Sequence, residues 1–297
     1  MNMNPVLFKE IKVKMRSWKV VWLIVAYLSV LALVAMFLLF TIRRQMYYSN
    51  MDPSMSISVY TTLAIIQFML IVFIAPSLTS GIISGERERQ TLDLLLCTKM
   101  PSRSIIIGKL FSSISQVILL IVASFPIFSI IFLFGGISML EVFKLFLFYI
   151  VVAITMGSIG IFFSTFLKKT TASNVLTYGF VLFLLFGTLF INVFYTSFLL
   201  KGTNYDKVFP LSYINPLTGF ASLLSDQFGG YGMGGSIIPG VYIPLPRTSV
   251  QRTTGLNTIP LWQINLIVSM LLSAFLLFLS MIKINPVKKR RLKRNKK

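Results

Sequence analysis

Long runs of apolar residues alternate with short polar stretches along most of the chain. Six of these runs are long enough to cross a bilayer as helices, because about 20 residues rising about 1.5 Å each span its hydrocarbon core. They cover about residues 20–41, 57–83, 105–134, 142–167, 174–200 and 261–282. None carries a charge in its central part. The pattern predicts an all-α integral membrane protein with six transmembrane helices.

The segment before the first run has a different pattern. Asn4 and Pro5 favour the start of a helix. At helical spacing after them come the apolar residues Phe8, Ile11, Met15 and Trp18, with basic residues in between. An apolar face with basic flanks suits the membrane interface. We expect residues 1–19 to form an interfacial helix; the alternative is a basic anchor that only sets orientation.

Composition and charge support this class and predict an orientation. Of the 297 residues, 56% are hydrophobic and 12% charged, and the net charge is +20. Of the 28 Lys and Arg residues, 21 fall on the side of the bilayer that holds both termini. Because basic segments stay inside, both termini are expected in the cytoplasm and the protein in the cell membrane. The basic tail, residues 283–297, is better explained by anionic lipid head groups than by nucleic acid.

The connection between the second and third crossings, residues 84–104, is longer than a simple link requires. It opens with glycine and charged residues, as favours a helix N-terminus. A leucine cluster follows, and Pro101 ends it. We expect a short cytoplasmic helix, charged first and apolar further on. Two interpretations of its leucines stay open: packing on the protein's own crossings, or docking into a groove of a soluble partner.

The residues of this connection resemble the signature of ABC-2 type transporter permeases. They read Gly85-Glu-Arg-Glu88, Thr91-Leu92, Leu95-Leu96, Pro101-Ser-Arg103 and Gly108-Lys109. In that family the first part is roughly G-E-R-E-x-G-T-L-x-x-L-L, and Gln90 stands where many members have glycine. The segment from Asn4 to Arg16 resembles the family's entry helix, and the six crossings also agree.

The resemblance implies the transmembrane subunit of an ABC transporter, by family habit an exporter, driven by a separate ABC ATPase subunit. Segment 84–104 would hold a coupling helix resting in a groove of that ATPase. Its contact residues would be Gly85, Glu86, Arg87, Glu88, Thr91, Leu92, Leu95 and Leu96, with the glutamates making polar contacts and the leucines apolar ones. A second permease copy or a paralogue would complete the transporter.

The chemistry-bearing residues limit what the chain does alone. It has no histidine and one cysteine, Cys97, and Gly108-Lys109 is followed by leucine instead of the Ser or Thr of a phosphate-binding loop. We expect no catalytic residue, metal site or cofactor on this chain; ATP and Mg²⁺ would bind the partner. The alternatives are a secondary transporter or a membrane scaffold without an ATPase. Ion-coupled carriers usually keep ionisable residues inside the membrane, and none lies at mid-crossing here.

The segment before the last crossing, residues 201–260, is expected outside the cell. Asn215-Pro216 is typical of a helix start. The residues Leu217, Phe220, Ala221 and Leu224 then predict a short amphipathic helix at the outer surface. This helix is either a lid over an outward opening or a helix packed over the ends of the crossings. The polar residues Gln67, Gln116, Asn174 and Asn192 are expected at helix interfaces.

Overall fold

The computed structural model describes residues 17–46, 53–92, 102–132, 137–198, 210–228 and 260–284. Its elements are α2 (Trp18–Met46), α3 (Pro53–Thr79), α4 (Ile82–Glu88), α6 (Ser102–Ala123), α7 (Phe125–Phe132), α8 (Met139–Phe166), α9 (Thr170–Leu182), a π-helical turn (Phe183–Gly187), α10 (Thr188–Phe198), a 3₁₀ turn (Pro210–Tyr213), α11 (Pro216–Gln227) and α12 (Leu261–Ile284). No strand occurs among these residues. The all-α class is therefore confirmed.

Six stretches of helix are long and apolar enough to cross a membrane, as predicted. They are Trp18–Thr41, Ile57–Glu88, Arg103–Ile130, Met139–Phe166, Thr170–Asn192 and Leu261–Ile284. The predicted interfacial helix lies almost entirely outside the described residues, and so do Phe8, Ile11 and Met15. Trp18, assigned to that helix from its spacing, is instead the first residue of α2.

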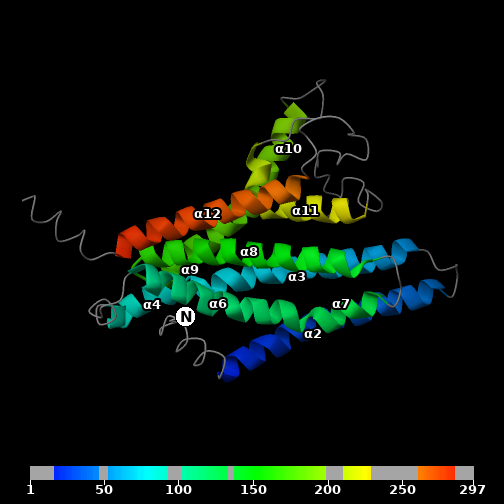
Figure 1. Cartoon of the computed structure of the whole chain (residues 1–297), viewed down its shortest axis with the longest axis horizontal. Helices are drawn as coiled ribbons and strands as arrows, with labels where there is room; N and C mark the ends of the chain where they lie inside the picture. The colour runs from blue at the N-terminus through cyan, green and yellow to red at the C-terminus, as the bar shows by residue number, and fades with distance from the viewer. Residues whose placement is uncertain are drawn as a thin grey trace, which may run out of the picture.

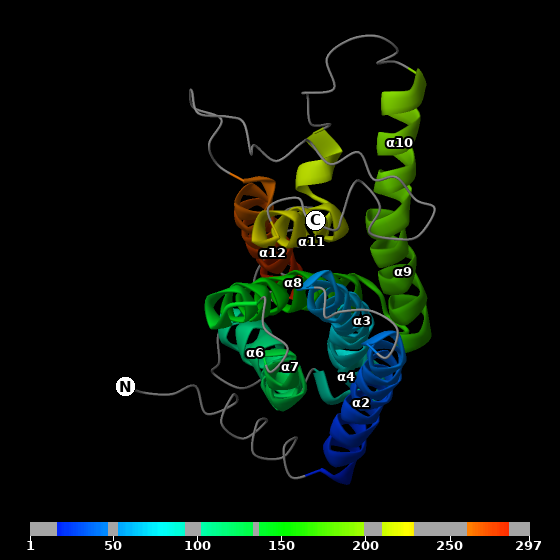
Figure 2. The same cartoon turned by 90° about the vertical axis from the view of Figure 1, so that its right-hand side faces the viewer.

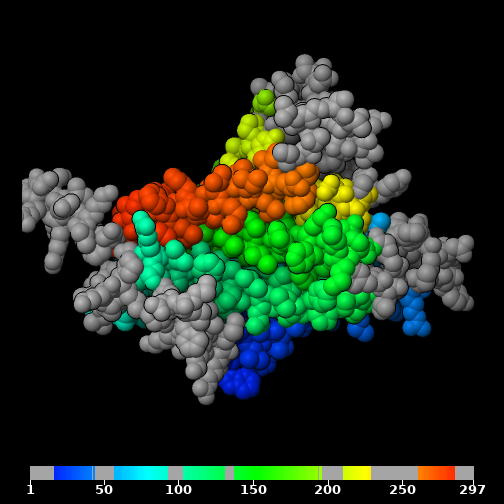
Figure 3. Space-filling model, viewed as in Figure 1, coloured from blue at the N-terminus to red at the C-terminus, as the bar shows by residue number. Residues whose placement is uncertain are grey.

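The helix α8 lies at the centre of the bundle. Ser138 and Glu141 form a capping box at its start, in which each side chain bonds the other's backbone N–H. In Figure 2 the bundle is seen nearly end-on, with α3, α6 and α12 around α8. The space-filling view shows α12 against one side of α8 and α6 on the other (Figure 3). Because α8 is covered on these sides, most of its residues are buried.

Small residues let the neighbours of α8 come close to it. A Cβ on Gly160 would lie 2.1 Å from the Thr79 hydroxyl oxygen and 3.1 Å from the Ser80 backbone N. On the α12 side, Ser269 and Ser273 are buried, and the Thr155 hydroxyl donates to the Ser269 carbonyl. Small and hydroxyl-bearing residues are typical of helix contacts in membranes, where they allow close approach and interhelical hydrogen bonds.

Three crossings are interrupted. The second turns at Ser80 and Gly81, between α3 and α4. The third breaks at Ser124, between α6 and α7, and the Gln67 amide of α3 donates to the Ser124 hydroxyl. The fifth contains the π-helical turn between α9 and α10. Figure 2 shows α9 and α10 rising along one side of the bundle, apart from α12. Gln67 thus lies at a helix interface, as predicted for it.

The helix α11 is present after Asn215-Pro216, as predicted, but it is not a surface helix. Every residue from Pro216 to Ser225 is buried. Phe220 stacks on Phe68 of α3, with ring centroids 4.6 Å apart. The helix predicted from the apolar spacing is therefore present. Its other face carries small hydroxyl residues, and α12 and the 3₁₀ turn cover that face. Of the two interpretations, packing over the ends of the crossings is the one observed.

The bundle has two ends that differ in what they contain. Figure 1 shows α4 and the last residues of α12 at one end, and α7 and α11 at the other. We call the first the motif end, because the Gly85-Glu-Arg-Glu88 motif lies there, and the second the α11 end. The contacts agree with this division: Lys283 of α12 lies over the Phe166 ring at the motif end, and Gln227 of α11 donates to the Glu141 carbonyl at the other.

Candidate functional site

The motif lies where the second crossing ends. After α3 the chain turns at Ser80 and Gly81 and continues as α4, so Gly85 to Glu88 form the last turn of a helix. The sequence predicted instead that a helix begins here. Residues 91 and 92 are helical again. The rest of the expected coupling helix, with Leu95, Leu96 and Cys97, lies outside the described residues.

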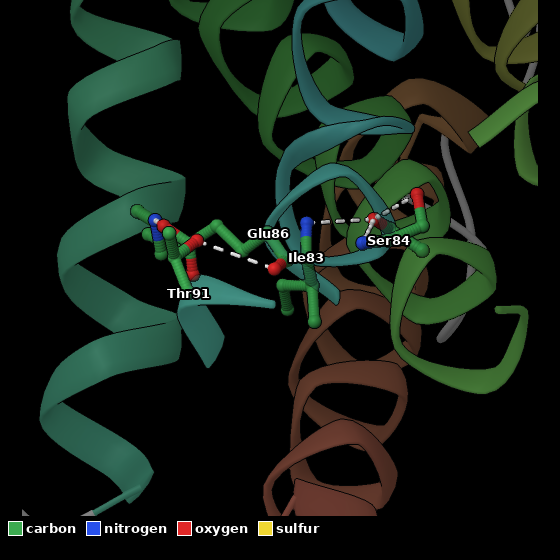
Figure 4. A network of polar contacts seen from close by, with 6 residues as sticks. Ile83, Ser84, Glu86 and Thr91 are labelled. Carbon is green, nitrogen blue, oxygen red and sulfur yellow. Dashed lines mark hydrogen bonds and ion pairs between the residues drawn. The ribbon is translucent and has the colours of Figure 1, made fainter. Parts of the chain in front are cut away.

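The start of α4 is held by Ser164 near the end of α8. The backbone N–H groups of Ile83 and Ser84 donate to its hydroxyl oxygen at 2.9 and 3.0 Å (Figure 4). The first N–H groups of a helix lack intrahelical partners, and a buried one left unpaired is costly. Ser164 supplies the missing acceptor. It therefore fixes where α4 begins relative to α8.

Arg87 ties α4 to the last carbonyls of α8. Its two terminal guanidinium nitrogens donate to the carbonyls of Leu167 and Thr165, at 3.0 and 3.2 Å. These carbonyls belong to the C-terminal turn of α8, where a helix carries a partial negative charge. A cation bonded to the last carbonyls stabilises that end. Arg87 is therefore engaged within the chain.

Glu86 ties α4 to the third crossing. One carboxylate oxygen forms an ion pair with Lys109 of α6 at 2.5 Å. Lys109 is only 4% exposed, although it is a lysine. A charge removed from water requires a partner. The Glu86 carbonyl also accepts from the Thr91 hydroxyl, so the chain after the turn is bonded back onto α4 (Figure 4).

Glu88 ties α4 to the fifth crossing. Its two carboxylate oxygens accept from the backbone N–H and the hydroxyl of Thr170, the first residue of α9, at 2.9 and 2.8 Å. Glu88 is exposed, beyond the apolar part of the second crossing.

Gln90 has a left-handed backbone, with φ of 58°. It follows Arg89, the C-cap of α4, at the position where helices commonly end in a left-handed glycine. The family pattern has glycine at this position. The departure noted in the sequence therefore changes the side chain but leaves the glycine-type turn in place.

The residues after Glu88 divide into exposed and buried ones. Arg89, Gln90 and Thr91 are exposed, and we call these three the exposed tip. Leu92 is 7% exposed and lies in an apolar cluster with Ile83, Ile106, Leu110, Ile114, Ile161 and Ile284. For this leucine, packing on the protein's own crossings is the interpretation that the structure supports. The structure does not support the assignment of Leu92 to a contact with the partner.

Comparison with protein families shows where the chain belongs. A model described as "ABC-2 family transporter protein" matches residues 5–281, nearly the whole chain. The chain belongs to the ABC-2 transporter family. This ABC-2 chain is thus a membrane transport component, of a family that associates with ABC ATPase subunits. No curated protein matches it.

Sequence reasoning on this ABC-2 chain found one side of the site and missed the other. Gly85, Glu86, Arg87 and Glu88 were singled out. The partners of the three charged residues are Lys109, which the family pattern had marked, and Thr165, Leu167 and Thr170, which no pattern marked. The last three lie far from the motif in the sequence, and they bind it through backbone carbonyl or N–H groups, which every residue has. No local signal distinguishes such residues.

Proposed function

We propose that this chain is the transmembrane subunit of an ATP-driven exporter, and that a separate ABC ATPase subunit docks from the cytoplasm on the motif end. The observation that supports this most is that some motif residues contact the chain's own crossings while their neighbours are exposed. Glu86, Arg87 and Glu88 bind three different crossings of the chain, while the exposed tip beside them stays open to a partner. A partner that moves the tip would act on several helices together.

The distribution of charge supports the orientation. The motif end carries Arg87, Arg89, Lys168 and Lys169, and the basic tail follows α12 at the same end. Positive segments are retained in the cytoplasm. An ATPase that uses cytoplasmic ATP is then on the correct side to reach the exposed tip.

The charges inside the bundle favour an ATPase over an ion gradient as the energy source. Lys109 is the one buried charged residue in the described part of the chain, and it is paired with Glu86 at the motif end. Ion-coupled carriers depend on ionisable groups along the transport path. The described crossings offer none at mid-depth.

A second permease subunit, either another copy or a paralogue, completes the proposed transporter. Several crossings have wide apolar faces that the chain does not cover. On α2, Trp22, Phe37 and Phe40 are mostly exposed, and so is Phe190 on α10. Lipid and the second subunit share such faces in this proposal.

The docking proposal is tested by co-purification. The tagged chain is purified from its host membrane in mild detergent, and co-purifying polypeptides are identified by mass spectrometry. A polypeptide with the phosphate-binding sequence G-x-x-x-x-G-K-[ST] should be present in stoichiometric amount. The double variant Arg89→Glu/Gln90→Arg should lose it, because it reverses the charge at position 89 and places a long charged side chain at position 90 of the exposed tip.

The matched control is Lys144→Glu, a charge reversal at the α11 end of α8. It should retain the ATPase. Absence of any ATPase from the wild-type preparation would refute the proposal, and equal loss from both variants would refute the assigned docking face. Reversal of Glu88 is a poor test of docking, because that carboxylate holds α9.

A further inference from the structure

The cytoplasmic start of the fifth crossing lacks a cap of its own. Lys169 occupies the N-cap position of α9 with an extended backbone, but its side chain forms no capping hydrogen bond. Residues with a short acceptor side chain are preferred at this position, because the first N–H groups of a helix need partners. The fifth crossing therefore begins with an N–H group that its own N-cap does not satisfy.

Glu88 supplies an acceptor from another crossing for the first N–H group of α9, that of Thr170. Both of its oxygens are used on Thr170, one on the backbone N–H and one on the hydroxyl. The negative charge also lies at the positive end of the α9 dipole. An N-cap at position 169, in the same segment of the chain, would also stabilise α9. A cap carried by α4 also makes the position of α9 depend on the position of α4.

The first two turns of α9 also contact the turn before α4 and the end of α3. The Ser80 hydroxyl donates to the Asn174 side-chain oxygen at 2.7 Å, and the Ser173 hydroxyl donates to the Ser80 carbonyl at 2.5 Å. A Cβ on Gly85 would lie 3.4 Å from the Thr170 methyl carbon, so α4 and α9 are in van der Waals contact at this position. Further along, the Tyr178 hydroxyl donates to the Phe73 carbonyl at 3.0 Å.

We propose that Glu88 is a positioning residue that couples the cytoplasmic loop to the fifth crossing by capping α9 from outside. This inference rests on the proposed function, in which an ATPase acts on that loop. Movement of α4 then carries the start of α9 with it through the carboxylate, and the Ser80–Asn174 bond ties α9 to the turn from which α4 starts. Glu88 is assigned to a contact within the permease chain and not to the contact with the ATPase.

The test measures movement of α9 in the assembled complex. Spin labels are placed at Val175 of α9 and Phe111 of α6, both exposed, in a Cys97→Ser background. The permease–ATPase complex in lipid nanodiscs is compared without nucleotide and with ATP and vanadate. Wild type should show a nucleotide-dependent change in the distance between the labels. Glu88→Ala should retain the ATPase and lose that change, while Lys144→Ala, at the α11 end of α8, should retain both.

A second variant separates coupling from simple stabilisation of a helix. Lys169→Asp gives α9 an N-cap from its own chain. In Glu88→Ala/Lys169→Asp the thermal stability lost with Glu88 should return, but the nucleotide-dependent distance change should not. If the double variant moves like wild type, the role of Glu88 is structural only and the inference is wrong.

Two further outcomes are distinguishable. If Glu88→Ala alone moves like wild type, or if wild type shows no change at α9, the inference fails while the proposed function stands. If no ATPase co-purifies with wild type, the proposed function itself fails.

Discussion

The two ends of the bundle are held together by different chemistry. At the motif end, charged side chains connect the helices: Glu86 to α6, Arg87 to α8 and Glu88 to α9. At the α11 end most connections are made by neutral amides. Asn215 caps α11 with its oxygen and donates through its nitrogen to the Leu185 carbonyl and the Thr188 hydroxyl. Asn265 donates to the carbonyls of Tyr213 and Asn215.

The difference follows from the surroundings and has a consequence for motion. The charged contact of Glu88 is exposed, and the energy of an exposed contact is small, so it rearranges easily, whereas the buried Lys109 keeps its pair with Glu86. Buried amides have no water to replace a lost partner, so breaking one leaves a polar group unsatisfied. We therefore expect the α11 end to behave as a fixed frame and the motif end, with its exposed tip, as the part that a partner displaces.

The largest loss of stability is expected from adding a Cβ at a glycine that packs tightly against another helix, and each end of the bundle has one such glycine. Gly160→Ala at the motif end places a Cβ 2.1 Å from the Thr79 hydroxyl oxygen, and Gly219→Ala at the α11 end places one 2.3 Å from the Asn265 side-chain oxygen. Each should cost about 3 kcal/mol through overpacking, measured by SDS-titrated unfolding in mixed micelles. Gly179→Ala is the control, because a Cβ there meets no atom within 4 Å. Equal stability of all three variants would contradict the close contacts at both ends.

The ion pair at the motif end gives the next effect. Lys109→Met leaves the Glu86 carboxylate without its cation, and the unfolding free energy should fall by about 2 kcal/mol. The loss is smaller than for a fully buried pair, because 23% of the Glu86 side chain is exposed and water can reach it. The double variant Glu86→Gln/Lys109→Met should be more stable than Lys109→Met. If it is less stable, the two side chains do not act as a pair.

The amide contacts of the α11 end are tested by Asn215. Asn215→Ala removes a helix cap and two donated bonds, and should cost about 1.5 kcal/mol in the same unfolding assay. Asn215→Ser retains the cap and loses the donors to the fifth crossing, so it should lie between Asn215→Ala and wild type. If serine restores full stability, the link from α11 to the π-helical turn contributes nothing.

The smallest effect concerns the turn before the exposed tip. Gln90→Gly should stabilise the protein by about 0.5 kcal/mol, because glycine adopts a left-handed backbone without steric cost. Gln90→Ala retains a Cβ and should give no gain. The measurement is the same unfolding titration. Destabilisation by glycine would mean that the turn at φ 58° is not the conformation adopted.

Much of the fold could be predicted because every helix that crosses a bilayer needs about 20 mainly apolar residues in a row. Apolar length alone located the six crossings, and Asn215-Pro216 located α11. Burial of α11 could not be predicted, because Thr218, Ser222 and Ser225 are polar by composition but small enough to pack inside. The motif residues were found by resemblance. Their internal partners depend on where α8 and α9 lie in space, and so the direction in which Glu86, Arg87 and Glu88 point could not be inferred from sequence.

The central claim is that an ABC ATPase binds the exposed tip, and photo-crosslinking in intact cells tests it most directly. A benzophenone amino acid is placed at Arg89 on the exposed tip or at Phe143, which is 68% exposed near the α11 end. Illumination should join position 89 to a polypeptide with an ABC phosphate-binding sequence, and position 143 should give no such product. An ATPase captured from position 143 and not from position 89, or from neither, would contradict the account.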